Sequence, residues 1–229
     1  MTAAELLAAI RRELAPIEEA IRAHPYLDAA AEGRLSEASL CSLAGEQYAI
    51  LSSDRRSFAQ LAARFPGPPG GDFFLGLAAG EGEALGLLLS FAATLGLDEG
   101  ALRAYEPQAG CQAYPAFVAW LALNGSQADL ALAFVANLSA WGENCARLAA
   151  ALRSPYGLGD AVAFFDFFSQ PPSGFEERAV AVAQAGLDAG DSPARARRAA
   201  RLLQAYELSF WDALYAEGQT QGQSLGQSL

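Results

Sequence analysis

Apolar residues recur at helical spacing along almost the whole chain, and this periodicity limits the folds that the sequence can adopt. Near the N-terminus, Leu6, Leu7, Ile10, Leu14 and Ile17 form one stripe of an amphipathic helix. No stretch alternates apolar and polar residues over the length of a strand, and no segment repeats with a period of about 20 to 50 residues. The sequence therefore predicts an all-α protein.

Turn-forming residues divide this pattern into separate helices. Residues 66–71, which read Pro-Gly-Pro-Pro-Gly-Gly, and Asn124-Gly125 are the clearest breakers. Pro16 is expected to kink or break the first helix. The expected helices span residues 2–24, 27–32, 36–65, 72–97, 98–107, 112–123, 126–153, 159–168, 174–187 and 192–217.

The breakers are all short, so no second domain is marked. We expect a single helical domain over residues 1–217, followed by a low-complexity tail over residues 218–229 in which Gly-Gln-Ser-Leu occurs twice. We expect this tail to be flexible.

The composition excludes several kinds of chemistry. All 15 basic residues are arginine, so the chain can form neither a lysine Schiff base nor a P-loop lysine contact. His24 is the only histidine, which excludes metal centres that need several histidine ligands. Cys41, Cys111 and Cys145 are far apart in the sequence and indicate reduced thiols. We expect no metal and no cofactor.

The charge and the apolar runs bear on partners and location. A net charge of −11 disfavours a nucleic-acid partner, because phosphate contacts need a basic surface. No uninterrupted apolar run reaches the roughly 18 residues of a membrane span. The N-terminal stripe is amphipathic and does not resemble a signal peptide. We therefore expect a cytoplasmic protein with no membrane partner.

Glu207 is the clearest polar residue on an apolar helix face. It has the same helical phase as Leu203, Phe210 and Leu214, and Trp211 flanks it. A buried polar group without a partner costs about 1–3 kcal/mol, so a carboxylate on this face is expected either to have a partner or to line a cavity. We interpret Glu207 as a residue that lines a pocket; pairing with an arginine or a helix end is the alternative.

Other expected helices carry similar polar residues. For each one alone, a satisfied hydrogen bond in the core is the alternative interpretation, but together they predict a small-molecule pocket. The polar residues on the expected helix 36–65 are Gln47, Tyr48 and one of Asp54 and Arg55. Tyr114 lies on the expected helix 112–123, and Asn137 lies beside the apolar stripe that contains Trp141 on the expected helix 126–153.

Two further features have simpler interpretations. Residues 80–86 have glycines spaced as in a dinucleotide-binding loop, but no strand precedes them, so we expect a closely packed helix segment. His24 could be an axial heme ligand, and a histidine satisfied at a helix end is the alternative.

Several segments, in order along residues 16–215, resemble the TenA family and its PqqC-like relatives, which have the heme-oxygenase-like fold. The last of them, Glu207 to Tyr215, is similar to the closing helix of the family, written E…FWD.AY. The others are His24-Pro25-Tyr26 with Gly33-Arg34-Leu35-Ser36, Glu46-Gln47-Tyr48, and Phe165-Asp166-Phe167-Phe168-Ser169.

The resemblance implies a bundle of about seven to nine helices around a central pocket, in homodimers or homotetramers. It also implies chemistry on thiamin-related aminopyrimidines, for which relatives use a cysteine nucleophile, a glutamate acid–base and an aspartate that holds the pyrimidine. This chain has Glu207 at the glutamate position and Tyr114 at a pocket tyrosine. It departs from the pattern with Asn137 at the cysteine, Gln47 at the aspartate, and Ile50 and Phe168 at two further tyrosines.

Because asparagine is no nucleophile, the covalent mechanism of the relatives cannot operate here, and Cys145 lies two turns away on the same expected helix. The PqqC branch uses several histidines, which this chain also lacks. Three hypotheses follow: an enzyme, a non-catalytic binding or regulatory protein, and a heme-binding protein that depends on His24 alone. In the first, Glu207 is the general acid–base. The predicted ligand contacts are Gln47, Tyr48, Tyr114, Asn137, Trp141, Phe168 and Trp211.

Overall fold

The computed structural model describes the backbone of residues 1–226 and the side chains of residues 1–218. In this part of the chain there are ten α-helices, one short 3-10 helix and no strand. Seven α-helices have 14 residues or more: α1 (Ala3–Arg22), α3 (Glu37–Arg64), α4 (Gly70–Thr94), α6 (Ala109–Asn124), α7 (Gln127–Arg153), α9 (Phe175–Asp188) and α10 (Pro193–Gly226). The shorter elements are α2 (Pro25–Ala31), α5 (Glu99–Ala104), η1 (Gly159–Val162) and α8 (Ala163–Ser169). The all-α prediction is confirmed.

Side chains cap the starts of several helices. Thr2 accepts a hydrogen bond from the backbone of Glu5, whose side chain bonds back to the Thr2 N–H in a capping box. Ser36 caps α3, and Ser126 with Asp129 forms a second capping box at the start of α7. These side chains satisfy amide groups that the first helical turn leaves without partners.

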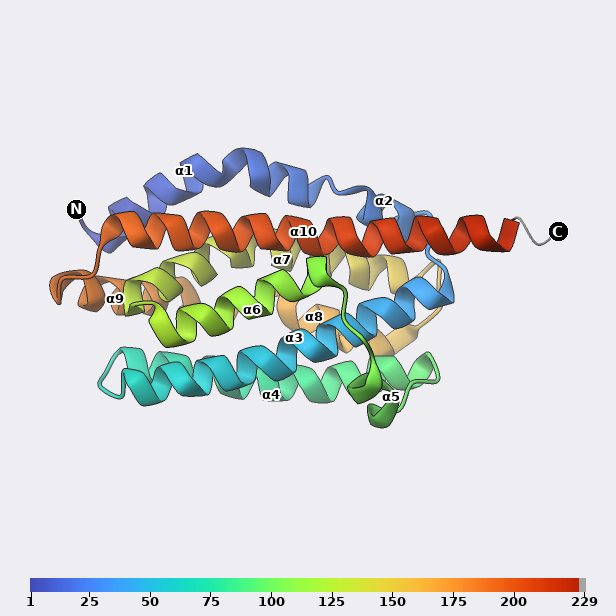
Figure 1. Ribbon diagram of the computed structural model, residues 1–229, viewed down its shortest axis with the longest axis horizontal. Coiled ribbons are helices and arrows are strands. Elements are labelled where there is room, and N and C mark those ends of the chain that lie inside the picture. The colour runs from blue at the N-terminus through green and yellow to red at the C-terminus, as the bar shows by residue number, and fades with distance from the viewer. Residues whose placement is uncertain (227–229) are drawn as a thin grey trace.

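One of two expectations about helices needs correction. Pro16 is expected to kink or break the first helix, and α1 continues from Ala3 to Arg22 without a break, along a bent path beside α10 (Figure 1). The last helix does not end near Glu217 but continues to Gly226, into the segment expected to be a flexible tail. Its glutamines and leucine are good helix formers, and extending an existing helix is easier than starting one. Residues 227–229 of the tail lie outside the described part.

The long helices pack in layers (Figure 1). The antiparallel pair α3 and α4 forms one side of the bundle, and α10 with α1 forms the other. Between these sides, α6 packs against α3 and α10, while α7 packs against α8, α9 and α10. Residues far apart in the sequence therefore face a common interior.

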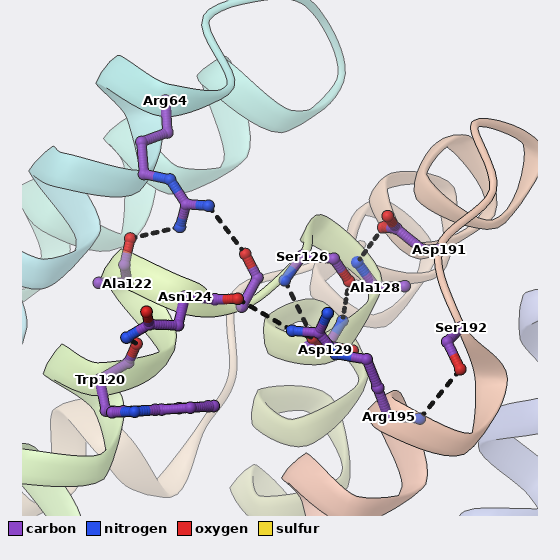
Figure 2. A network of polar contacts seen from close by, with 11 residues as sticks. Arg64, Trp120, Ala122, Asn124, Ser126, Ala128, Asp129, Asp191, Ser192 and Arg195 are labelled. Atoms are coloured by element: carbon purple, nitrogen blue, oxygen red, sulfur yellow. Dashed lines mark hydrogen bonds and ion pairs between the residues drawn. The ribbon is translucent and has the colours of Figure 1, made fainter.

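The turn between α6 and α7 connects several helix ends (Figure 2). Arg64, at the end of α3, donates hydrogen bonds to the carbonyl oxygens of Ala122 and Gly125, the second at 3.0 Å. Asp191, in the loop before α10, accepts a hydrogen bond of 3.1 Å from the backbone of Ala128. Arg195 of α10 donates to the Asn124 carbonyl at 2.9 Å. These contacts satisfy carbonyl groups at the end of α6 and an amide group at the start of α7, and they hold α3, α6, α7 and α10 in register.

Among the described residues, α4 alone is long and apolar enough to cross a membrane, with a window of mean hydropathy 1.4 that is 22% buried. One such helix is weak evidence for a membrane span, because a mostly buried core helix of a soluble protein passes the same test. Phe74, Leu88 and Phe91 of α4 are fully buried, and the helix packs along the length of α3. α4 is therefore an integral wall of the bundle.

Candidate functional site

A cavity of about 630 Å³ lies inside the bundle, within the size range of small-molecule sites. Its walls come from α3, α4, α6, α7, α8, α9 and α10, together with the loops around Pro68 and Pro171. Most of the lining is apolar, and nine aromatic rings face it: Phe58, Phe73, Tyr114, Phe134, Trp141, Phe167, Phe168, Phe175 and Phe210. The structure thus contains a pocket suited to a flat, largely apolar molecule.

Glu207 of α10 lies in the wall of this cavity and is 3% exposed. Its Oε2 accepts a hydrogen bond from Nδ2 of Asn137 on α7, and its Oε1 accepts one of 3.3 Å from Nε1 of Trp211. The same Asn137 amide donates to Oε1 of Gln204 at 2.5 Å, and its Oδ1 accepts a long hydrogen bond of 3.5 Å from the Tyr114 hydroxyl. No arginine pairs directly with Glu207 in the described part of the chain, so the pocket interpretation is the one that the geometry supports.

Burial raises the pKa of Glu207 to about 8, although the hydrogen bonds from Trp211 and Asn137 favour the charged form and act in the opposite direction. A carboxyl group with a pKa in this range holds its proton at neutral pH but releases it readily. That property suits proton transfer to or from a bound molecule.

Four other predicted contacts also line the cavity. The amide of Gln47 is 2% exposed and has no hydrogen-bond partner among the described residues, so it can bond a ligand. Tyr114, whose pKa is raised by burial and by nearby carboxylates, faces the cavity from α6. Trp141 and Phe168 stack edge to face with their ring centroids 6.0 Å apart. Polar groups from α3, α6, α7 and α10 therefore converge on one space, as the sequence predicts.

The structure places two predicted ligand contacts elsewhere. Tyr48 does not line the cavity; its hydroxyl donates to Glu99 of α5 at 3.2 Å. Adjacent helical positions differ by about 100°, so a helix that turns Gln47 to the cavity directs its neighbour away. Trp211 is fully buried and lies behind Glu207, which it holds through its indole N–H. Its prediction as a ligand contact is corrected to a supporting position.

Two further carboxyl groups line the cavity: Asp54, which the sequence left as an alternative to Arg55, and Glu81, which sequence reasoning missed. Asp54 of α3 is 3% exposed, whereas Arg55 is exposed, which resolves the ambiguity between these neighbours. Glu81 of α4 faces the same space. Burial raises the pKa of both well above ordinary values, and the charge of Asp54 raises that of Glu81 further. The sequence did carry a signal, because Glu81 has the phase of Phe74 and Leu88, seven residues to each side.

The single histidine is occupied at a helix end. His24 caps α2, where its Nδ1 accepts a hydrogen bond of 3.2 Å from the Tyr26 backbone, and its Nε2 lies 3.2 Å from Asp212. It does not line the cavity. Both ring nitrogens have protein partners, so the structure favours the helix-end interpretation and does not fit His24 as a heme ligand in this cavity.

The cysteines also lie outside the cavity. Cys145 is fully buried, and burial raises its pKa well above the ordinary value. Its thiol therefore does not replace the nucleophile that Asn137 lacks. Among the described residues, no three His, Cys, Asp or Glu side chains are grouped so that they could hold a metal ion.

The sequence pattern of the TENA/THI-4/PQQC family matches residues 11–217. This match covers most of the chain, and the chain therefore belongs to that family. No curated protein matches the full sequence closely enough to identify a nearer relative.

Solved structures show the same fold. A TenA homologue from P. horikoshii OT3 superposes with a TM-score of 0.74 at 18% identity, covering 93% of this chain and 99% of that one. A TenA homologue from Pyrococcus furiosus gives 0.72 at 21% identity, covering 92% and 100%. A domain of unknown function from Shewanella denitrificans OS217, described as having a heme oxygenase-like fold, gives 0.73 at 17% identity, covering 93% of each chain. The predicted heme-oxygenase-like fold is confirmed.

Proposed function

We propose that this protein binds a small heteroaromatic molecule, related to thiamin or to its aminopyrimidine, in the central cavity. Family membership supports the thiamin-related class. The observation that carries the proposal is the convergence of Glu207, Asn137 and the free amide of Gln47 on an aromatic-lined cavity. Amide groups can hydrogen-bond the edge of a heterocycle while the rings enclose its faces.

In this proposal Glu207 is the group that moves a proton. When protonated it donates to a basic ligand atom, and when ionised it accepts a proton, with a pKa of about 8 that permits both near neutrality. Trp211 and Asn137 hold its two oxygens in place. Asn137 orients Glu207 and the ligand and forms no covalent bond, so any turnover proceeds without an enzyme-bound intermediate at this position.

A non-catalytic binding protein is the second candidate. It is favoured by the amides at the two positions where the resemblance implies a nucleophile and an aspartate, since amides recognise ligands well and are poor catalysts. Incubation with thiamin or 4-amino-2-methylpyrimidine, followed by mass spectrometry, separates the candidates. Conversion that Glu207→Gln abolishes supports the enzyme, and recovery of intact bound ligand supports the binding protein.

A thermal-shift screen tests the shared part of both candidates. A ligand at about 100 times its dissociation constant adds about 2.7 kcal/mol to stability, or about 5 to 10 °C in a domain of this size. The shift should disappear in Gln47→Ala and persist in Gln60→Ala, an exposed glutamine on the same helix. No shift with either probe would contradict the proposed ligand class.

We further propose a soluble, cytoplasmic homodimer or homotetramer. Leu75 of α4 and Trp120 and Leu123 of α6 are exposed apolar side chains that a subunit interface would cover. Light scattering of the purified protein tests this directly, and a monomer would contradict it.

A further inference from the structure

One side of the cavity carries two carboxyl groups without partners. Asp54 of α3 is 3% exposed, and its Oδ1 is fully buried with no hydrogen-bond partner. Glu81, on the neighbouring α4, lines the same wall. Neither side chain forms a hydrogen bond or an ion pair with any described residue. An unpartnered buried carboxyl is costly, so its position beside an open cavity points to a ligand group.

No arginine side chain around Asp54 and Glu81 forms an ion pair with either carboxyl group among the described residues. Arg55, next to Asp54 on α3, is exposed, and its guanidinium lies against Gly82 on the neighbouring helix. The one arginine in the cavity wall, Arg178 of α9, is exposed and donates to the Ser173 carbonyl at 2.8 Å. Among the described residues, no arginine therefore forms an ion pair with Asp54 or Glu81, although the Arg55 guanidinium lies near them.

The wall holds two more carboxyl groups, Asp72 of α4 and Glu207 of α10. Tyr114 of α6 is near Asp54, Glu81 and Glu207. Aromatic rings make up much of the remaining wall, and their faces attract cations. Carboxyl groups and aromatic faces together form a lining that is complementary to a positive organic group.

We propose that Asp54 and Glu81 form a subsite for a protonated amino or amidino group on the ligand. A cation with N–H donors fits better than a quaternary ammonium, because N–H groups donate hydrogen bonds to carboxyl oxygens and a quaternary ammonium has none to donate. This inference deepens the proposed function by naming the charge of the molecule that the same cavity takes. The aromatic part of that molecule lies among the rings, and Glu207 with Gln47 contacts its other edge.

Binding of a cation at this subsite should release a proton. Burial raises the pKa of Asp54 and Glu81, so the empty pair holds its protons more tightly than ordinary carboxyl groups do. An arriving cation favours the ionised carboxyl, and the displaced proton passes to solvent. Cation binding is therefore coupled to proton release, whereas binding of a neutral molecule is not.

The test uses three probes of similar size: benzylammonium, benzyltrimethylammonium and benzyl alcohol. Calorimetric titration of the full chain at pH 7, in two buffers of different ionisation enthalpy, gives both affinity and protons released. We expect benzylammonium to bind at least about tenfold more tightly than benzyl alcohol and more tightly than benzyltrimethylammonium. Asp54→Asn and Glu81→Gln should remove this preference and the proton release, whereas the exposed Glu83→Gln on α4 should retain both.

The test uses two variants, Asp54→Asn and Glu81→Gln, so that it does not depend on the folding of one. Each variant removes an acid and adds none, and circular dichroism checks that both keep their helices. Equal affinity of the native protein for benzylammonium and benzyl alcohol would overturn the proposal, as would a preference that survives in both variants. These fragments contain no heterocycle. The binding of these fragments therefore does not depend on whether an aminopyrimidine binds. A failure of the cation subsite can be distinguished in this way from a failure of the proposed aminopyrimidine ligand.

Discussion

Replacing Glu207 with glutamine should change how the stability of the protein depends on pH. The pKa of Glu207 is raised from an ordinary 4.5 to about 8 in the folded protein. Between these values the folded state holds one more proton at this site than the unfolded state. The free energy of unfolding that Glu207 contributes is therefore fully present below about pH 4.5 and is lost as the pH rises through 8.

The size of this effect follows from the difference between the two pKa values. Each pKa unit corresponds to about 1.4 kcal/mol, so the upper limit is about 5 kcal/mol between pH 4.5 and 8. Relaxation of a buried site reduces this figure, and we expect about 2 to 5 kcal/mol. That is a large fraction of the total stability of an ordinary domain, about 5–15 kcal/mol.

Urea unfolding of the native protein and of Glu207→Gln, at several values between pH 5 and pH 8.5, measures the effect. The native protein should lose stability relative to the variant as the pH rises. Asp54 and Glu81 also have raised pKa values, but they are present in both proteins and largely cancel in the difference. In the control variant Glu19→Gln, at an exposed position, the free energy of unfolding should depend on pH as it does in the native protein. A difference between native protein and Glu207→Gln that stays constant over this range would refute the reasoning.

Three further substitutions test the structure around the site and its scaffold. Trp211→Phe removes the indole donor to Glu207 and should raise the pKa of that carboxyl further, which a carbon-13 NMR titration of the side chain measures; an unchanged or lower pKa would contradict this. Gly45→Ala places a methyl group 2.4 Å from the ring of Tyr105 and should cost about 1–3 kcal/mol in chemical unfolding; a neutral effect would show that the ring moves freely. Ser126→Ala removes the N-cap of α7 and should cost about 1 kcal/mol, so an unchanged melting temperature would count against the capping role.

Most of the helical framework could be predicted from the sequence because capping residues and breakers mark its helices clearly. Ser36, Ser126 and the proline-rich segment 66–71 each mark a boundary that the structure confirms to within a few residues. The end of α10 was missed because glycine and serine are frequent in both tails and turns. No local rule indicates that an established helix continues through them.

The cavity residues were predictable where helical phase is unambiguous. Glu207 lies at the phase of Leu203 and Phe210, and the structure buries it with them. Phase did not separate Asp54 from Arg55, nor Gln47 from Tyr48, because adjacent positions near the edge of a stripe differ by only about 100°. Which one faces inward depends on how α3 packs against α4 and α6, and that depends on residues distant in the sequence.

The central claim is that this cavity binds an aminopyrimidine through Gln47 and the Glu207–Asn137 pair. Calorimetric titration of 4-amino-2-methylpyrimidine into the native protein and into Gln47→Ala tests it most directly. The account predicts saturable binding at one site per chain, weakened at least about tenfold by the substitution because a ligand polar group loses its partner. Binding of equal strength to both proteins, or to neither, would contradict it.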